Sequence, residues 1–357
     1  MADWDFPEQP EAKRLLSAAL AEGAAHAYLF HGPRGVGKRA AATQFAAGLL
    51  GGDPRALRGA HPDLYRLEAV GDMIRIDAIR ELRRDLHMRP FEADRRVYLI
   101  FDAHLLGQEA ADALLKDLEE PPPYATIVLV ADDLGPLSET IRSRCQHVPF
   151  RRLSERAIRE RLPDGLDADE ATALARIAGG RLDRLERLLD PDARTRRESL
   201  LEVARSVYAD AGFEPADAAG RLLGSAQARG RKAREDAEEE VERLELPARE
   251  AEQRLKRIQR GGEREELLDG LEELAAWYRD LVVVAVGADA AAVHHDRLPL
   301  LREDATIERL AGAEAAAELV RDAWRRLEEL NLAPQLALEA LFIRLRRELA
   351  GTAVARS

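Results

Sequence analysis

A glycine-rich segment with a lysine near its end is the feature of this sequence most suited to chemistry. Residues 32–39 read Gly-Pro-Arg-Gly-Val-Gly-Lys-Arg and match the spacing G-x-x-x-x-G-K of a phosphate-binding loop. Glycines let consecutive backbone N–H groups turn toward an anion, and a following helix adds partial positive charge. The pattern therefore predicts phosphate binding by Gly32, Gly35, Gly37 and Lys38, with a chance glycine-rich turn as the alternative.

The residue after this lysine departs from an active nucleotide site. A Ser or Thr hydroxyl normally ligates Mg²⁺ there, whereas this chain has Arg39, a cation with no acceptor atom. An acidic pair at the end of a neighbouring strand should give the second metal support, but Phe101 and Asp102 occupy those positions. Two metal supports are missing, so we expect no metal site, no required cofactor, and at most ATP or ADP binding without hydrolysis.

The elements that must position this loop are short apolar runs with helical stretches between them. The runs are residues 28–30, 97–101, 126–130 and 147–150. Apolar runs without polar alternation are typical of a parallel sheet that is covered on both faces. The sequence thus predicts an α/β domain of the nucleotide-binding type.

The rest of the chain has helical composition. Short helices fill residues 153–191, and Pro191-Asp192 resembles a boundary before a helical region, 192–357. Within it, residues 229–266 are mostly Arg, Lys and Glu. They fit either a pair of solvated helices held by ion pairs or a projecting arm for a partner.

Charge and cysteine content exclude several classes of protein. The 357 residues include 54 Lys and Arg against 66 Asp and Glu, for a net charge of −12, so a uniformly basic nucleic-acid face is excluded. Cys145 is the only cysteine, which excludes a disulfide scaffold and a Cys-cluster zinc site. An acidic N-terminal segment and the lack of a long apolar run predict a cytoplasmic protein without a membrane partner.

A local basic patch that contacts DNA remains a hypothesis. Its members are Arg80, Arg83, Arg84, Arg89, Arg95 and Arg96.

Several segments together resemble a known family. They are residues 26–33, the His-Pro-Asp-Leu of 61–64, the Ala-Leu-Leu-Lys-Asp-Leu-Glu-Glu-Pro-Pro of 113–122, and 140–145, which ends in Ser-Arg-Cys. These segments resemble the AAA+ clamp-loader subunits of bacterial DNA polymerase III, most closely the delta-prime subunits. The resemblance is dense as far as Asp190 and thin afterwards.

The resemblance implies a fold and a set of partners. The fold is a RecA-like AAA+ P-loop domain (1–152), a small helical lid (153–191) and an all-α collar (192–357). The partners are gamma/tau and delta subunits, and, through the assembled complex, the sliding clamp and primed DNA. In this family gamma/tau hydrolyse ATP and delta-prime does not. The alternatives are an active gamma/tau-type ATPase and a scaffold that binds no nucleotide.

The resemblance also assigns roles to single residues. Arg144 lies in the Ser-Arg-Cys segment, whose arginine reaches a phosphate on the adjacent subunit, and Arg184 lies where the lid carries a phosphate-facing arginine; a surface arginine is the alternative for each. Asp132 falls near a polar sensor position, where it would repel a γ-phosphate. Relatives usually carry a four-cysteine zinc module before residue 61, which is absent here, so no zinc is expected. His294 and its neighbour fit a metal site poorly, and we expect solvated or half-packed rings.

Overall fold

The computed structural model describes residues 4–69, 73–243, 247–329 and 333–350. The chain divides into two compact units. The first comprises Met1–Glu160 with Gly179–Asp183, and the second comprises Arg161–Ala178 with Arg184–Ser357. The segment expected to form a separate lid is thus shared between the two units, and its identity as a domain of its own stays a prediction.

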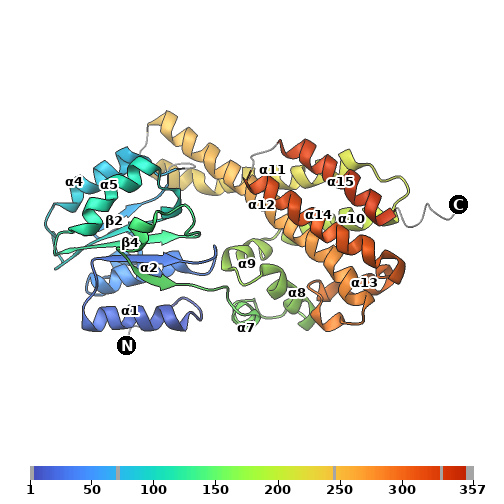
Figure 1. Cartoon of the computed structure of the whole chain (residues 1–357), viewed down its shortest axis with the longest axis horizontal. Coiled ribbons are helices and arrows are strands. Elements are labelled where there is room, and N and C mark those ends of the chain that lie inside the picture. Colours follow the sequence, from blue (N-terminus) through green and yellow to red (C-terminus); the bar gives the residue numbers. More distant parts are fainter. Residues whose placement is uncertain (1–3, 70–72, 244–246, 330–332, 351–357) are drawn as a thin grey trace. The chain divides into compact units, whose positions relative to one another are not determined.

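The first unit contains a five-stranded sheet in which every neighbouring pair is parallel (Figure 1). The strand order is β2-β3-β4-β1-β5, so β4 separates the strand before the glycine-rich loop from β3. This is the arrangement expected of a RecA-like P-loop domain. The strands are β1 (Ala27–His31), β2 (Leu64–Leu67), β3 (Arg96–Ile100), β4 (Ala125–Ala131) and β5 (Gln146–Pro149).

Both faces of this sheet are covered, as the unalternated apolar runs predicted. Along β1, Tyr28 and Phe30 pack in one hydrophobic core, and Ala27 and Leu29 pack in a second core on the opposite face. Because successive side chains of a strand point to opposite faces, burial on both sides requires a continuous apolar run. The α/β class is confirmed. The sequence did not predict β2, which has four residues and an exposed Arg66.

Helices of the first unit connect and flank these strands (Figure 1). Helix α2 begins at Lys38, directly after the glycine-rich loop, and α5 ends at Glu119 ahead of three prolines. The helices are α1 (Pro10–Glu22), α2 (Lys38–Leu49), α3 (Pro54–Leu57), α4 (Ile76–Leu86), α5 (Gln108–Glu119), α6 (Glu139–Arg142) and α7 (Glu155–Arg159), with a 3₁₀ turn, η1, at Ala103–Leu105.

The second unit is helical throughout the residues that the structure describes. Its core contains Trp277, Tyr278 and Phe342, all fully buried. The β-branched run after Trp277 was predicted to be helical, and it is: α12 continues to Ala285. Helix α9 (Leu182–Leu188) begins in the first unit and ends in the second. The other helices are α8 (Ala168–Ala178), α10 (Ala193–Ala209), α11 (Pro215–Arg243), α12 (Ala248–Ala285), α13 (Leu298–Asp304), α14 (Leu310–Glu329) and α15 (Pro334–Ala350), with 3₁₀ turns η2 (Asp289–Ala291), η3 (His295–Arg297) and η4 (Ile307–Arg309).

Within the described ranges, no helix is both long enough and apolar enough to span a bilayer.

Candidate nucleotide site and arginine finger

The backbone of the glycine-rich loop has the shape of an anion-binding loop. It connects the end of β1 to Lys38, the first residue of α2. Gly32, Gly35 and Gly37 have φ values of 134°, 72° and 94°, a region that favours glycine. A Cβ atom on Gly32 would lie 2.1 Å from the carbonyl oxygen of Phe150, so only glycine fits there. The strand–loop–helix arrangement predicted for the loop is confirmed.

The lysine of this loop is already occupied by groups of its own chain. The Nζ atom of Lys38 donates to the carbonyl oxygens of Gly32 (2.6 Å) and Pro33 (2.5 Å) and lies 2.8 Å from Asp132 Oδ1. Burial lowers the pKa of Lys38, against the attraction of Asp132 and two further carboxylates, Asp102 and Asp183. A phosphate would have to displace these contacts, because they use the same ammonium group.

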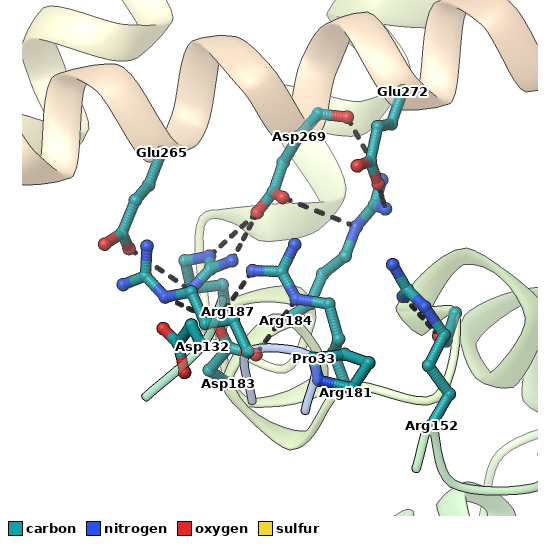
Figure 2. A network of polar contacts seen from close by, with 12 residues as sticks. Pro33, Asp132, Arg152, Arg181, Asp183, Arg184, Arg187, Glu265, Asp269 and Glu272 are labelled. Atoms are coloured by element: carbon teal, nitrogen blue, oxygen red, sulfur yellow. Dashed lines mark hydrogen bonds and ion pairs between the residues drawn. The ribbon is translucent and has the colours of Figure 1, made fainter. Parts of the chain in front are cut away.

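A carboxylate that the sequence did not indicate also lies at the loop. The backbone N–H of Leu182 donates to the carbonyl oxygen of Gly35 at 2.7 Å, which brings the next residue, Asp183, to the loop. Asp183 pairs with Arg181 at 2.7 Å and lies 3.7 Å from Arg34 (Figure 2). Gly35 and Leu182 are far apart in the sequence, with four of the five strands between them. The spacing of neighbouring residues therefore could not predict this contact.

A guanidinium group is bound to Asp102, the carboxylate that follows the end of β3. Arg39 donates to Asp102 Oδ2 at 2.6 Å and to Glu68 Oε1 at 3.4 Å. Its guanidinium also lies 4.6 Å from the ring centroid of Phe101. The positive charge that Mg²⁺ brings to an active site is supplied here by a side chain, and the two positions that should carry metal ligands hold Arg39 and Phe101. The residues present therefore do not fit a magnesium ion.

The arginine of the Ser-Arg-Cys segment follows a short helix, α6, and is partly exposed. Its guanidinium donates to the carbonyl oxygen of Thr140 at 2.9 Å and pairs with Glu119 Oε1 at 2.5 Å. The side chain of Arg144 is 32% exposed. Glu119 is the last residue of α5, and the sequence did not indicate its pairing with Arg144. The adjacent Cys145 is buried, and burial raises the pKa of its thiol to about 12.

The second predicted phosphate-facing arginine is also paired. Arg184 is buried and contacts Glu272 and the carbonyl oxygen of Asp269, the latter at 3.0 Å (Figure 2). One turn later, Arg187 pairs with Asp269 at 2.5 Å and with Glu265 at 3.3 Å. The guanidinium of Arg184 thus joins α9 to α12 within the second unit, and its phosphate-facing role stays a prediction.

The structure corrects the expectation for His294. The ring is fully buried, with Nδ1 2.9 Å from Asp280 and Nε2 3.6 Å from Glu273. Burial alone would lower the pKa of His294, but the hydrogen bonds to these carboxylates outweigh it and raise the pKa. Arg197 extends the cluster through Glu273 (2.9 Å) and Asp296 (2.6 Å). Among the described residues, no group of three or more His, Cys, Asp or Glu is placed to hold a metal ion.

Half of the arginines in the basic patch predicted for the first unit are paired with carboxylates. Arg96 is buried and pairs with Asp85 at 2.7 Å, and Arg83 pairs with the buried Asp117 at 2.6 Å. Arg80 lies 3.1 Å from a carboxylate on its own helix. Three of the six cations therefore have carboxylate partners, and contact of this patch with DNA stays a prediction.

The fold and these motifs define a RecA-like P-loop domain. Residues 8–154 match the family model described as DNA polymerase III, delta subunit. The chain is 33% identical to the delta' subunit of Bacillus subtilis (strain 168) over 182 residues, 47% of this chain and 54% of that protein. It is 33% identical to the delta' subunit of Pseudomonas aeruginosa over 197 residues, 50% of this chain and 60% of that one. Over this region, the chain is similar to the DNA polymerase III delta family and to these delta' subunits.

Similarity alone does not separate delta-prime subunits from tau subunits. The tau subunit of Bacillus subtilis (strain 168) is also 33% identical, over 171 residues that are 44% of this chain and 30% of that protein. The chain thus spans between 30% and 60% of the length of these three relatives. The distinction has to come from the residues of the site itself.

Proposed function

We propose that this chain is a delta-prime-type subunit of a bacterial DNA polymerase III clamp loader that does not hydrolyse ATP. It assembles with gamma/tau and delta subunits in the cytoplasm, and through that complex it helps to load the sliding clamp on primed DNA. The single observation that carries the proposal is the guanidinium of Arg39, held 2.6 Å from Asp102 and over the ring of Phe101.

This observation favours a non-hydrolysing role for an electrostatic reason. Magnesium-assisted phosphoryl transfer depends on a cation that the protein holds beside the phosphates. Arg39 places a fixed positive charge beside Asp102, and the guanidinium can neither ligate a metal ion nor leave the chain. Any nucleotide that enters the loop would bind without a metal ion held by these residues. The contact between Lys38 and Asp132 further weakens the case for tight phosphate binding.

Arg144 provides the contribution to catalysis that we propose for this subunit. A planar guanidinium offers fixed donors to phosphoryl oxygens that gain negative charge, and such arginines contribute about 10³- to 10⁵-fold to the rate where they have been measured. Arg144 is partly exposed and lies outside the glycine-rich loop. It can therefore serve a nucleotide on a neighbouring subunit although its own site has lost the metal supports.

The test is ATP hydrolysis by a complex of gamma/tau, delta and this chain, stimulated by clamp and primed DNA. We expect R144A to lose most of the rate and R144K to recover little of it, because lysine lacks the planar donors. R151A is the matched control, since Arg151 is an exposed arginine of the same unit. All complexes must first be shown to assemble equally by size-exclusion chromatography. An unchanged rate in R144A would reduce the role of this chain to architecture.

The similarity to tau makes an active ATPase the second candidate. It is tested with the purified chain alone, by phosphate release with and without Mg²⁺. Measurable turnover would favour the tau-like role. Nucleotide binding without turnover would agree with the proposal, whereas neither binding nor turnover would favour a scaffold whose only catalytic contribution is Arg144.

A further inference from the structure

The charged segment of the second unit is a packed helical hairpin. We refer to residues 229–243 of α11 and 248–266 of α12 as the charged hairpin (Figure 1). At Gly230 an added Cβ would lie 2.7 Å from the carbonyl oxygen of Gln259, so the two helices approach closely there. Farther along, Arg234 pairs with Glu252 at 2.8 Å, and Val241 is buried. The hairpin therefore presents its charges from a defined scaffold.

The two exposed edges of this hairpin carry opposite charge. The acidic edge lies on α11, and its exposed residues are Glu235, Asp236, Glu238, Glu239 and Glu242. The basic edge lies on α12, and its exposed cations are Arg249, Lys256, Arg260 and Arg264. If these charges served only to stabilise the two helices in solvent, acidic and basic residues would be expected to alternate along each helix, where they form ion pairs. Apart from the exposed Arg231 and Glu250, the sign of the charge here changes from one helix to the other.

The basic edge follows a straight line along its helix. Positions 249, 253, 256, 260 and 264 follow at intervals of three or four residues, which places them on a single face, and all but Gln253 are cations. At 1.5 Å per residue the line is about 22 Å long. In the described part of the chain, Arg249 and Arg260 on this line have no carboxylate partner, and Lys256 lies 3.5 Å from Glu252 on its own helix.

We propose that the basic edge of the charged hairpin binds the phosphate backbone of duplex nucleic acid. A straight row of cations matches a linear polyanion, and phosphate contacts supply most of the affinity in such complexes. Protein partners instead need apolar or aromatic anchors at the centre of an interface. The exposed positions of the basic edge are arginine, lysine and glutamine, so it offers no such anchor.

The remaining charges of the chain determine which side of the hairpin can face the nucleic acid. The whole chain has a net charge of −12, so general attraction to phosphate is weak and binding depends on local cations. The acidic edge of α11 repels the same backbone, which leaves the α12 side as the contact. This inference goes beyond the proposed function, because it needs neither ATP nor another subunit.

The experiment measures direct binding by the full chain. Fluorescence anisotropy with a fluorescein-labelled DNA duplex of moderate length gives Kd over a range of salt concentrations. We expect R249Q/K256Q/R260Q to raise Kd by about tenfold or more at low salt. The slope of log K against log salt should fall by about 2 to 3, since each phosphate contact contributes about 0.9. Glutamine keeps a high helix propensity, so the hairpin should stay helical.

Two matched variants separate phosphate contact from general effects. E235Q/D236N/E242Q neutralises three charges on the acidic edge of the same hairpin and should bind DNA equally well or more tightly. R249K/K256R/R260K keeps the charge and should retain the salt slope. The proposal is overturned if the unmodified chain binds no duplex at low salt, or if the glutamine variant keeps its Kd and slope. It is also overturned if that variant loses assembly with gamma/tau and delta while DNA binding is unchanged, because the edge would then contact protein.

Discussion

The glycine-rich loop and the core of the helical unit both pair cations with carboxylates, yet the consequences differ. At the loop, Arg39 is half exposed beside Asp102. In the helical unit, Arg197, Glu273 and His294 are almost completely buried. Exposed pairs contribute little to stability, whereas removing one member of a buried pair is costly. Arg39 can therefore exchange its partners at low cost, and the helical core cannot.

This comparison explains how the two units can serve different purposes with the same side chains. The pairs at the loop occupy positions that a phosphate and a metal ion would otherwise take. The buried pairs connect α10, α12 and the turn at residues 288–297, and they hold a helical scaffold together. Changes to the pairs at the loop should thus leave the architecture of the second unit untouched.

The largest effect is expected from breaking the buried cluster. Glu273→Ala should lower the free energy of unfolding by about 3–5 kcal/mol, because it leaves the charges of Arg197 and His294 buried without their shared carboxylate. Urea unfolding monitored by circular dichroism measures this. Glu303→Ala is the control, since Glu303 is exposed and lies 3.9 Å from its cation. Equal effects of the two variants would contradict the comparison.

Restoring a hydroxyl at position 39 tests whether the pair between Arg39 and Asp102 stands in place of a metal ion. Arg39→Thr restores a hydroxyl but should create no ATPase, because Phe101 still removes the second metal support. Arg39→Thr combined with Phe101→Asp should make nucleotide binding depend on Mg²⁺, by about tenfold in Kd, as measured by isothermal titration calorimetry. Turnover by the single variant would show that our account of the site is wrong.

A smaller change is expected where an exposed pair restrains the proposed arginine finger. Glu119→Gln removes the carboxylate that lies 2.5 Å from Arg144 and should raise the ATPase rate of the reconstituted complex by about two- to fivefold, as expected for an exposed pair worth under about 1 kcal/mol. Glu120→Gln, at the next residue, is the matched control. A decrease in rate would mean that Glu119 orients the arginine for catalysis.

The smallest effect concerns pH. The carboxylates around His294 raise its pKa above the ordinary value of 6.5, despite complete burial. A raised pKa means that the protonated ring contributes its full stability below pH 6.5 and loses it as the pH rises through the pKa of the folded state. The melting temperature should therefore fall with rising pH more steeply in the unmodified chain than in His294→Gln. Identical slopes would contradict this assignment.

Part of the fold and of the site could be predicted because it depends on neighbouring residues. Apolar runs without alternation indicated four of the five strands, but β2 was missed because a short strand with an exposed arginine carries too little pattern. The glycine-rich loop followed from its spacing, and its lost metal supports followed from the chemistry of Arg39 and Phe101. Burial of His294 was not predicted, because its carboxylate partners lie on a different element, the preceding helix α12.

The sequence by itself determined which groups this protein has available for chemistry. The order of side chains at residues 32–39 and 101–102 is sufficient to infer a phosphate loop without metal ligands, since ligand type is a property of each residue. Only the tertiary structure decided which charge each group pairs with. Asp132 binds Lys38, and Glu119 binds Arg144, although neither pair is close in the sequence. Electrostatic pairing depends on distance and burial in space, and both are fixed only when the sheet and helices pack.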